Sequence, residues 1–336
     1  RKEGLLIFGP IRAAAMMEAS KYFAKQIMAE ASVPTGKFAE FTDFKKACQY
    51  AQTADFPVVI KADGLAKGKG VFIIKNREEA RDILSQIMEK KIFSQAGERV
   101  VIEEFLEGEE FTVLSFTDGK TVSMMPVSQD HKKLLDHDEG PNTGGMGAFA
   151  PVPLAGQDLH FIRERILLPV IQALKKRNIP YQGVLYAGLI RTKDGFKVLE
   201  FNCRLGDPET QVILPLLRTD LMDIILAVLN NRLDKIKIRW EKKKVLSVVA
   251  VSQGYPDHYE KGFPVTGLKR QKGILVFHAG TAIRNNVLVT NGGRVLNVTA
   301  VSGRFSRSRE MVYEALGKIH FKNIFFRTDI GKRFLS

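Results

Sequence analysis

The stretch that most constrains the fold runs from Leu199 to Glu209 and reads L-E-F-N-C-R-L-G-D-P-E. It follows a turn at 193–195, and its first half has the composition of a strand. Because side chains alternate along a strand, Glu200, Asn202 and Arg204 are expected on one face. Magnesium prefers hard oxygen ligands, and arginine neutralises phosphate with a planar fork. The row therefore favours a magnesium–phosphate site, with a half-exposed edge strand and a surface ion pair as the alternative.

The composition sets the class of protein. A chain of 336 residues holds two or three domains with ample core. Its 45% hydrophobic and 26% charged residues are typical of a soluble globular protein. No apolar run reaches the length of a membrane span and nothing resembles a signal peptide, so we expect a cytoplasmic protein without a membrane partner. Two cysteines, Cys48 and Cys203, give neither a disulfide framework nor metal-ligand spacing.

The net charge of +14 raises the question of a nucleic-acid partner. The lysines and arginines are spread along the chain, however, and no basic motif interleaved with aromatic residues is found. A positive field that attracts phosphorylated metabolites explains the charge as well. We therefore expect small-molecule partners and no nucleic acid.

A glycine-rich loop at 62–70 lies between two predicted strands, at 56–61 and 71–74. Glycine allows a backbone to approach phosphate oxygens closely, so this loop can fold its N–H groups over a nucleotide. It is not a Walker A loop, because Gly70 stands where serine or threonine is needed, and Ile73 stands where a Rossmann fingerprint has its third glycine. A flexible hairpin explains the loop about as well.

Hydrophobic patterning predicts further elements on either side of this loop. A buried strand over 4–10 and a helix over 13–31 come first. The loop opens a compact α+β unit over 62–127. The segment 140–147, G-P-N-T-G-G-M-G, is too glycine-rich for regular structure, and we interpret it as an ordered loop over a ligand. From residue 245 onward, short strands with glycine turns predict a separate β-rich domain.

Together these pieces resemble the ATP-grasp superfamily, with a strand lysine, a glycine-rich flap, an acid-ended strand and a terminal E-x-N-x-R row. Within it, the chain is most similar to the phosphoribosylamine–glycine ligases, and the resemblance covers essentially the whole chain. D-H-K with G-P-N-T-G-G-M-G and N-C-R-L-G-D-P-E is specific to that family. The motifs that carry the resemblance are K-A-D-G-L-A-K-G-K-G-V (61–71), V-I-E-E-F-L-E-G-E-E (101–110), S-Q-D-H-K (128–132), G-P-N-T-G-G-M-G (140–147), L-E-F-N-C-R-L-G-D-P-E-T-Q (199–211), F-H-A-G-T (277–281) and T-N-G-G-R-V-L (290–296).

The resemblance implies an α+β and α/β chain with an ATP-grasp fold, in which two α+β lobes hold ATP, and a C-terminal β-rich domain. The family's amino-terminal α/β domain, with its G-N-G-G-R-E-H type motif, has no counterpart here, so we expect only a remnant of it. The expected boundaries are a remnant at 1–20, a central domain at 21–61 and 128–231, a flap at 62–127, a linker at 232–244 and the C-terminal domain at 245–336.

The resemblance also implies a reaction of purine biosynthesis. ATP phosphorylates the carboxylate of glycine to a glycyl phosphate, and the amine of 5-phosphoribosylamine attacks that carbonyl. The products are glycinamide ribonucleotide, ADP and phosphate, and the expected cofactors are ATP with Mg²⁺ or Mn²⁺. The alternative is a nucleotide-binding fragment without ligase activity, because the amino-terminal substrate domain is missing. We expect a monomer or a weak homo-oligomer.

The site residues implied by the resemblance are transferred position by position. Those expected to bind ATP are Lys21, Lys61, Gly68, Gly70, Val71, Glu103, Glu104, Leu106, Glu109 and Glu110. Those expected to act in catalysis are Lys132, Asn142, Arg204 and Asp207. Those expected to bind the substrates are Asp130, Lys132, Gly144, Gly145, Met146, Arg204, Gly206, Asp207, Pro208 and Glu209. Many ATP-grasp enzymes add a metal carboxylate from the preceding strand, but residues 186–189 hold no acid, so Glu200 and Asn202 are expected to hold the metal.

Overall fold

The structure is a computed structural model that describes residues 4–64 and 70–332. Its chain divides into two compact units. The first contains Arg1–Met125, Leu154–Arg204 and Met222–Lys237, and the second contains Pro126–Pro153, Leu205–Leu221 and Ile238–Ser336. Across the described ranges, no helix combines the length and apolar character that a membrane crossing requires.

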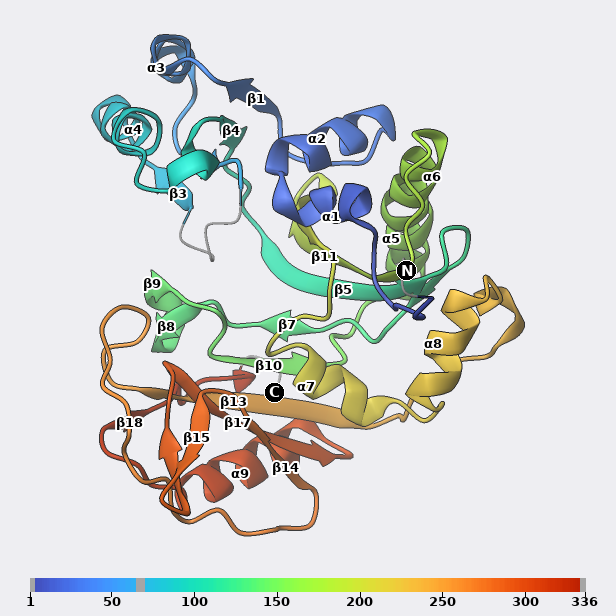
Figure 1. The fold of residues 1–336 in the computed structure, drawn as a ribbon, viewed down its shortest axis with the longest axis vertical. Helices are drawn as coiled ribbons and strands as arrows, with labels where there is room; N and C mark the ends of the chain where they lie inside the picture. The colour runs from blue at the N-terminus through green and yellow to red at the C-terminus, as the bar shows by residue number, and fades with distance from the viewer. Residues whose placement is uncertain (1–3, 65–69, 333–336) are drawn as a thin grey trace. The chain divides into compact units, whose positions relative to one another are not determined.

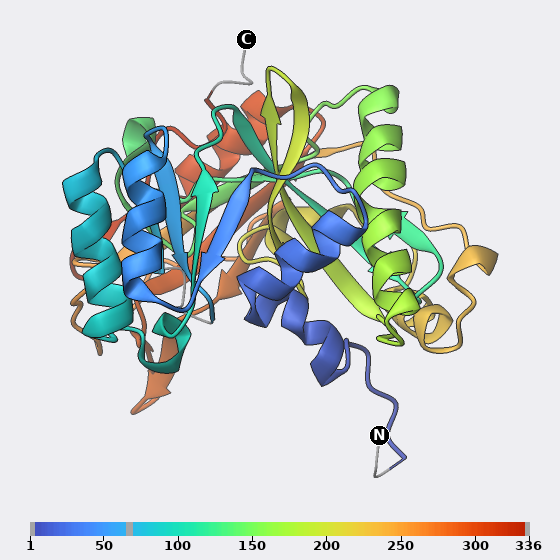
Figure 2. The same ribbon diagram turned by 90° about the horizontal axis from the view of Figure 1, so that it is seen from above.

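One sheet of the first unit carries the glycine-rich loop. Its strands pair antiparallel in the order β1-β4-β2-β3. The β-branched and aromatic composition of these segments favours strands, and their inward residues form a core with two helices. Figure 2 shows those helices, α3 and α4, side by side against the sheet. The bounds are β1 Phe38–Phe41, α3 Phe44–Thr53, β2 Val58–Ala62, β3 Val71–Ile74, α4 Arg77–Leu84, with a π-helical turn at Ser85–Glu89, and β4 Val100–Glu104.

The second sheet of this unit is antiparallel with the order β12-β11-β5-β6. The central strands β11 and β5 are buried along almost their whole length, and α1 and α2 contact β12 (Figure 1). The bounds are α1 Arg12–Ala19, α2 Lys21–Glu30, β5 Glu109–Thr117, β6 Val122–Met124, α5 Gly156–Ile162, α6 Leu168–Lys176, β11 Gly183–Thr192, β12 Gly195–Asn202 and α8 Leu221–Leu229.

The first residues of the chain correct two expectations. Residues 4–10 form no strand, and Leu5 and Leu6 are exposed, because the described residues offer this segment no pairing partner. The helix expected over 13–31 is interrupted at Ser20, whose backbone is extended and whose hydroxyl accepts a hydrogen bond from the N–H of Phe23. Ser20 is therefore the N-cap of a second helix, a position that serine favours.

The second unit is built on the sheet β14-β17-β13-β10-β7, with β18 paired to β13. Helix α9 packs on β13 and β17, below them in Figure 1. The bounds are β7 Gln129–Asp130, β8 Lys133–Leu135, β9 Glu139–Asn142, β10 Gly147–Ala150, α7 Thr210–Ile213, β13 Lys244–Ser252, β14 Ile274–His278, β15 Thr281–Arg284, β16 Val287–Thr290, β17 Arg294–Ser302, α9 Phe305–Leu316 and β18 Ile324–Phe325.

The sheet pairing differs from the expected domain boundaries. The lobe expected over 62–127 shares its sheet with β1 and β2, which begin at Phe38 and Val58, whereas β5 and β6 pair outside it. Strands β7 and β10, expected in the central domain, extend the C-terminal sheet instead. The segment 140–147 is also more regular than expected, because residues 140–142 pair with β8 in a hairpin.

Candidate active site

A buried cluster of two lysines and one carboxylate lies in the first unit. Lys61 Nζ is 3.0 Å from Glu103 Oε1, and Lys25 Nζ is 2.8 Å from Glu103 Oε2. The β2–β4 register pairs Val59 with Glu103, so Lys61 and Glu103 are diagonal neighbours on one face of the sheet. Lys25 is 2% exposed and Glu103 is 6% exposed. Since two ammonium groups share one carboxylate, the cluster carries surplus positive charge.

Lys21 extends this positive charge from the first turn of α2. Its Nζ donates a hydrogen bond to the carbonyl of Gly64 at 3.0 Å. Burial lowers the pKa of Lys21, opposed by the nearby charge of Glu200 and assisted by that of Lys61. The start of α2 is also tied to the glycine-rich loop, because the Ser20 hydroxyl and the Tyr22 N–H donate to the carboxylate of Asp63. This arrangement sets a cation beside the loop expected to cover phosphates.

The two side chains expected to hold the metal, Glu200 and Asn202, lie at the end of β12. Glu200 is exposed and pairs with Gly188 of β11, and Asn202 pairs with Tyr186. No group of three or more His, Cys, Asp or Glu that could hold a metal is found in the described part of the chain. A carboxylate and an amide oxygen nevertheless fit magnesium, which keeps waters and phosphate oxygens as its other ligands.

Arg204 corrects the single row expected from the sequence. Strand β12 ends at Asn202, so Arg204 lies beyond the alternating side chains. Its Nε donates to Glu18 Oε1 at 2.9 Å, and the N–H of Cys203 donates to Glu18 Oε2 at 2.8 Å. The carboxylate of Glu18 on α1 therefore attracts the chain away from a strand geometry.

The remaining positions expected to bind ATP are divided between the two sheets of the first unit. Glu104 forms an ion pair with Lys197 at 3.0 Å, and its N–H donates to the carbonyl of Lys37, so this end of β4 is already bonded within the unit. Val71 pairs with Lys61, and the Gly70 carbonyl accepts from Ala62. The register places the acids at the start of β5, Glu109 and Glu110, opposite Arg191 and Ile190, and a Cβ on Gly36 would lie 3.6 Å from Leu106. Gly68 lies outside the described residues.

The positions expected to bind substrates and to act in catalysis gather in the second unit, apart from Arg204. Lys132 precedes β8, and Asn142 pairs with Lys133 at the end of the hairpin. The N–H and hydroxyl of Thr143 both donate to the carbonyl of Lys132. Gly145 has φ +108°, and a Cβ there would lie 2.4 Å from Cδ of Pro208. The loops 143–146 and 206–209 are therefore in contact, and Asp130 and Met146 lie on the adjoining backbone.

The β8–β9 hairpin is anchored by a buried arginine. Arg327 is 1% exposed, and its Nη1 donates to Asp138 Oδ1 at 2.9 Å and to the carbonyl of Lys133 at 3.0 Å. Asp329 accepts from Arg327 and from the N–H of His137. Burial alone would raise the pKa of Asp329, but these hydrogen bonds outweigh burial and hold the pKa well below its usual range. Ion pairs and hydrogen bonds of Arg327 thus hold the β8–β9 hairpin, which carries Asn142, in place.

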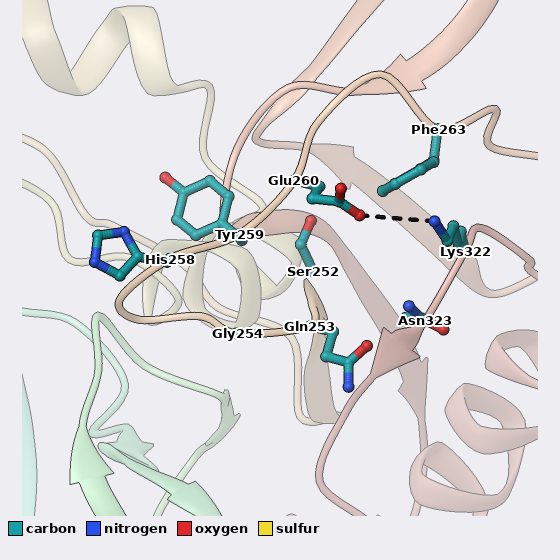
Figure 3. Close-up of a pocket in the computed structure, with 9 residues that line it drawn as sticks. All are labelled: Ser252, Gln253, Gly254, His258, Tyr259, Glu260, Phe263, Lys322 and Asn323. Atoms are coloured by element: carbon teal, nitrogen blue, oxygen red, sulfur yellow. Dashed lines mark ion pairs between the residues drawn. The ribbon is translucent and has the colours of Figure 1, made fainter.

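A cavity of about 450 Å³ lies elsewhere in the second unit (Figure 3). Its lining mixes polar side chains with the rings of Tyr259 and Phe263. It includes the ion pair of Lys322 with Glu260 at 3.6 Å, whose members are both more than half exposed. Surface pairs of this kind contribute little to stability or specificity. None of the positions expected to bind ATP or substrates lines this cavity.

Comparison with known proteins decides the family. The model of the phosphoribosylglycinamide synthetase ATP-grasp (A) domain matches residues 19–210, and the model of the C domain of the same synthetase matches residues 245–333. The chain belongs to this family. Phosphoribosylamine–glycine ligase of Caldanaerobacter subterraneus is 50% identical over 331 residues, which cover 98% of this chain and 79% of that protein. The trifunctional purine biosynthetic protein adenosine-3 of Gallus gallus is 49% identical, covering 99% of this chain and 34% of that protein.

Solved structures agree with this assignment. The crystal structure of phosphoribosylamine–glycine ligase from Thermotoga maritima has a TM-score of 0.90 at 34% identity and covers 96% of this chain and 81% of that one. The biotin carboxylase domain of Hydrogenobacter thermophilus 2-oxoglutarate carboxylase has a TM-score of 0.75 at 16% identity, which shows a shared fold alone. The expected ATP-grasp fold and the class of ATP-dependent ligase of purine biosynthesis are confirmed.

Three side chains that contact the predicted site residues of this synthetase were not predicted from the sequence. Lys25 lies four residues after Lys21, and that spacing places both lysines on one helix face. Arg294 stands inside the motif T-N-G-G-R-V-L but received no role. The Tyr255 hydroxyl accepts a hydrogen bond from Gly144 in the loop 143–146, which lies 111 residues earlier in the sequence. The helical spacing of Lys25 and the motif around Arg294 were local signals, whereas the contact of Tyr255 depends on tertiary structure.

Proposed function

We propose that this chain ligates glycine to 5-phosphoribosylamine through a glycyl phosphate, giving glycinamide ribonucleotide, ADP and phosphate. The observation that carries the proposal is the surplus positive charge of the Lys25–Glu103–Lys61 cluster. Lys21 lies in the same unit as this cluster and as the side-chain oxygens of Glu200 and Asn202 on β12. Phosphoryl transfer between anions depends on charge neutralisation and alignment more than on a protein nucleophile. A site of this composition fits that requirement.

In this proposal the first unit holds ATP. Lys21 and Lys61 neutralise phosphate oxygens, and Glu103 fixes the Lys61 ammonium from the adjacent strand. Glu200 and Asn202 hold Mg²⁺ or Mn²⁺, which when bound lowers the repulsion between the transferring phosphoryl group and the attacking carboxylate. Gly70 and Val71 close the end of the glycine-rich loop against β2.

The second unit supplies the groups for glycine and the amine in this proposal. Lys132 and Asn142, held at the two ends of the β8–β9 hairpin, are the side chains that orient the carboxylate and its acyl phosphate. Asp207 and the loop 143–146 support them. A cytoplasmic location and a monomeric or weakly oligomeric state remain predictions.

The experiment is isothermal titration with a non-hydrolysable ATP analogue, with and without magnesium, on the wild type and on Glu200→Gln. The proposal expects magnesium-dependent binding that Glu200→Gln weakens. Asp194→Asn, which changes an exposed acid in the turn before the same strand, is the matched control and should bind as the wild type does. Unchanged magnesium dependence in Glu200→Gln would remove that residue from the metal site. Analogue binding without any product from glycine and 5-phosphoribosylamine would favour the nucleotide-binding alternative.

A further inference from the structure

Arg294, the first residue of β17, joins two loops that are distant in sequence. Its Nη1 donates to the carbonyl of Gly144 at 2.6 Å and to the carbonyl of Asp207 at 3.0 Å. Its Nη2 donates to Asp207 Oδ2 at 2.9 Å. Both loops hold positions that the family resemblance predicts to bind substrates, and the Arg294 side chain is only 21% exposed. One guanidinium therefore fixes the distance between them.

Both the N–H and the carbonyl of Gly144 are hydrogen-bonded to side chains. The Tyr255 hydroxyl accepts a hydrogen bond from the Gly144 N–H at 2.8 Å, while Arg294 binds the Gly144 carbonyl. A Cβ at this position would lie 3.1 Å from Arg294 Cζ and 3.2 Å from the Tyr255 hydroxyl oxygen. A Cβ at this position would therefore push the Arg294 or Tyr255 side chain away by a few tenths of an ångström.

The N–H groups of the same loop are used within the unit. The Thr143 N–H donates to the carbonyl of Lys132, the Gly145 N–H to the Thr143 hydroxyl, and the Met146 N–H to the carbonyl of His131. The family resemblance predicts that Gly144 and Gly145 help to position the substrates, and this role stays a prediction. These bonds fix the loop, and through Thr143 the loop also holds the backbone carbonyl of Lys132.

Asp207 is likewise held through both carboxylate oxygens. Oδ2 accepts from Arg294, and Oδ1 accepts from the side-chain amide of Gln211 at 2.9 Å. Two hydrogen bonds, one of them from a charged guanidinium, hold this carboxylate in a fixed position. Asp207 therefore ties its own loop to Arg294, and its catalytic role stays a prediction.

We infer that Arg294 is a positioning residue for the carboxylate–amine half of the reaction. It acts through Gly144 and Asp207, which it holds together so that Lys132 and Asn142 keep a fixed geometry. This inference rests on the proposed function for the identity of the substrates, but the contacts themselves lie within one unit. Misplacing groups by about 1 Å costs roughly 100-fold in rate, so a positioning role has measurable consequences.

The test compares Arg294→Ala and Arg294→Lys with Arg270→Ala, which removes an exposed arginine of the same unit. Steady-state kinetics measure kcat and the KM values for ATP, glycine and 5-phosphoribosylamine. Arg294→Ala is expected to lose roughly 10- to 100-fold in kcat/KM for glycine and 5-phosphoribosylamine, the loss that a charged hydrogen bond contributes. The affinity for an ATP analogue should stay unchanged, and Arg294→Lys should recover part of the loss, because the ammonium keeps the positive charge but lacks the planar fork of the guanidinium.

Amide hydrogen exchange gives a second readout that needs no turnover. The inference expects faster exchange at 144–146 in Arg294→Ala and wild-type exchange there in Arg270→Ala. Wild-type kinetics and exchange in Arg294→Ala would overturn it, as would a loss of ATP-analogue affinity equal to the loss for the other substrates. If the wild type forms no product, the proposed function fails, and the exchange at 144–146 still decides whether Arg294 holds the loop.

Discussion

Replacing Glu103 by glutamine tests the buried charge cluster most severely. The substitution keeps the shape of the side chain but removes the carboxylate that contacts the ammonium groups of Lys25 and Lys61, at 2.8 and 3.0 Å. Lys25 is 2% exposed, so water cannot compensate for the lost charge. Breaking a buried ion pair by removing one partner costs about 3–5 kcal/mol. We therefore expect Glu103→Gln to lose about that much in the free energy of unfolding.

The assay is urea unfolding followed by far-ultraviolet circular dichroism. Glu104→Gln is the matched control, because its carboxylate is the next one along the same strand and pairs with a partly exposed Lys197. Pairs near the surface contribute about 1 kcal/mol or less. Adding Lys25→Met to Glu103→Gln should restore part of the stability, since it removes one of the two unbalanced charges. A loss in Glu103→Gln no larger than that in Glu104→Gln would refute the reasoning.

Three further predictions concern the second unit and the buried thiol. Gly145→Ala should lower kcat/KM at least tenfold relative to Gly195→Ala, because both glycines have positive φ but only Gly145 faces a contact at 2.4 Å. Hydrogen bonds from Arg327 depress the folded pKa of Asp329, against the effect of burial. The free energy of unfolding should therefore fall as the pH drops below about 4, the unfolded pKa of aspartate. In urea titrations, Asp329→Asn should show a weaker fall. Burial raises the pKa of Cys203 to about 11, so alkylation by iodoacetamide should be slow at pH 8 and accelerate toward pH 11, and fast alkylation at pH 8 would contradict this.

Local pattern predicted those parts of the fold that depend on local interactions. The apolar run at 71–74 forms β3 with the expected bounds. The segment at 4–10 has an equally strand-like composition, yet a strand also needs a partner, and pattern carries no information about pairing. The break at Ser20 follows from its bond to Asp63, a contact across 43 residues.

The candidate site was predicted unevenly for the same reason. Glu200 and Asn202 share a strand, so their common face follows from alternation. Arg204 does not follow, because the carboxylate of Glu18, 186 residues earlier, draws it aside. The shared carboxylate between two lysines and the clamp at Arg294 both join segments that only tertiary structure brings together. The motifs predict which residues bind and react, whereas the residues that hold them in place become visible only in the tertiary structure.

The measurement that tests the central claim most directly is a product assay on this chain with ATP, magnesium, glycine and 5-phosphoribosylamine. Chromatography would quantify ADP and glycinamide ribonucleotide over time. The account predicts that both appear in equal amounts and only when glycine and 5-phosphoribosylamine are present together. ADP formed at the same rate without either substrate, or nucleotide binding with no glycinamide ribonucleotide, would contradict it.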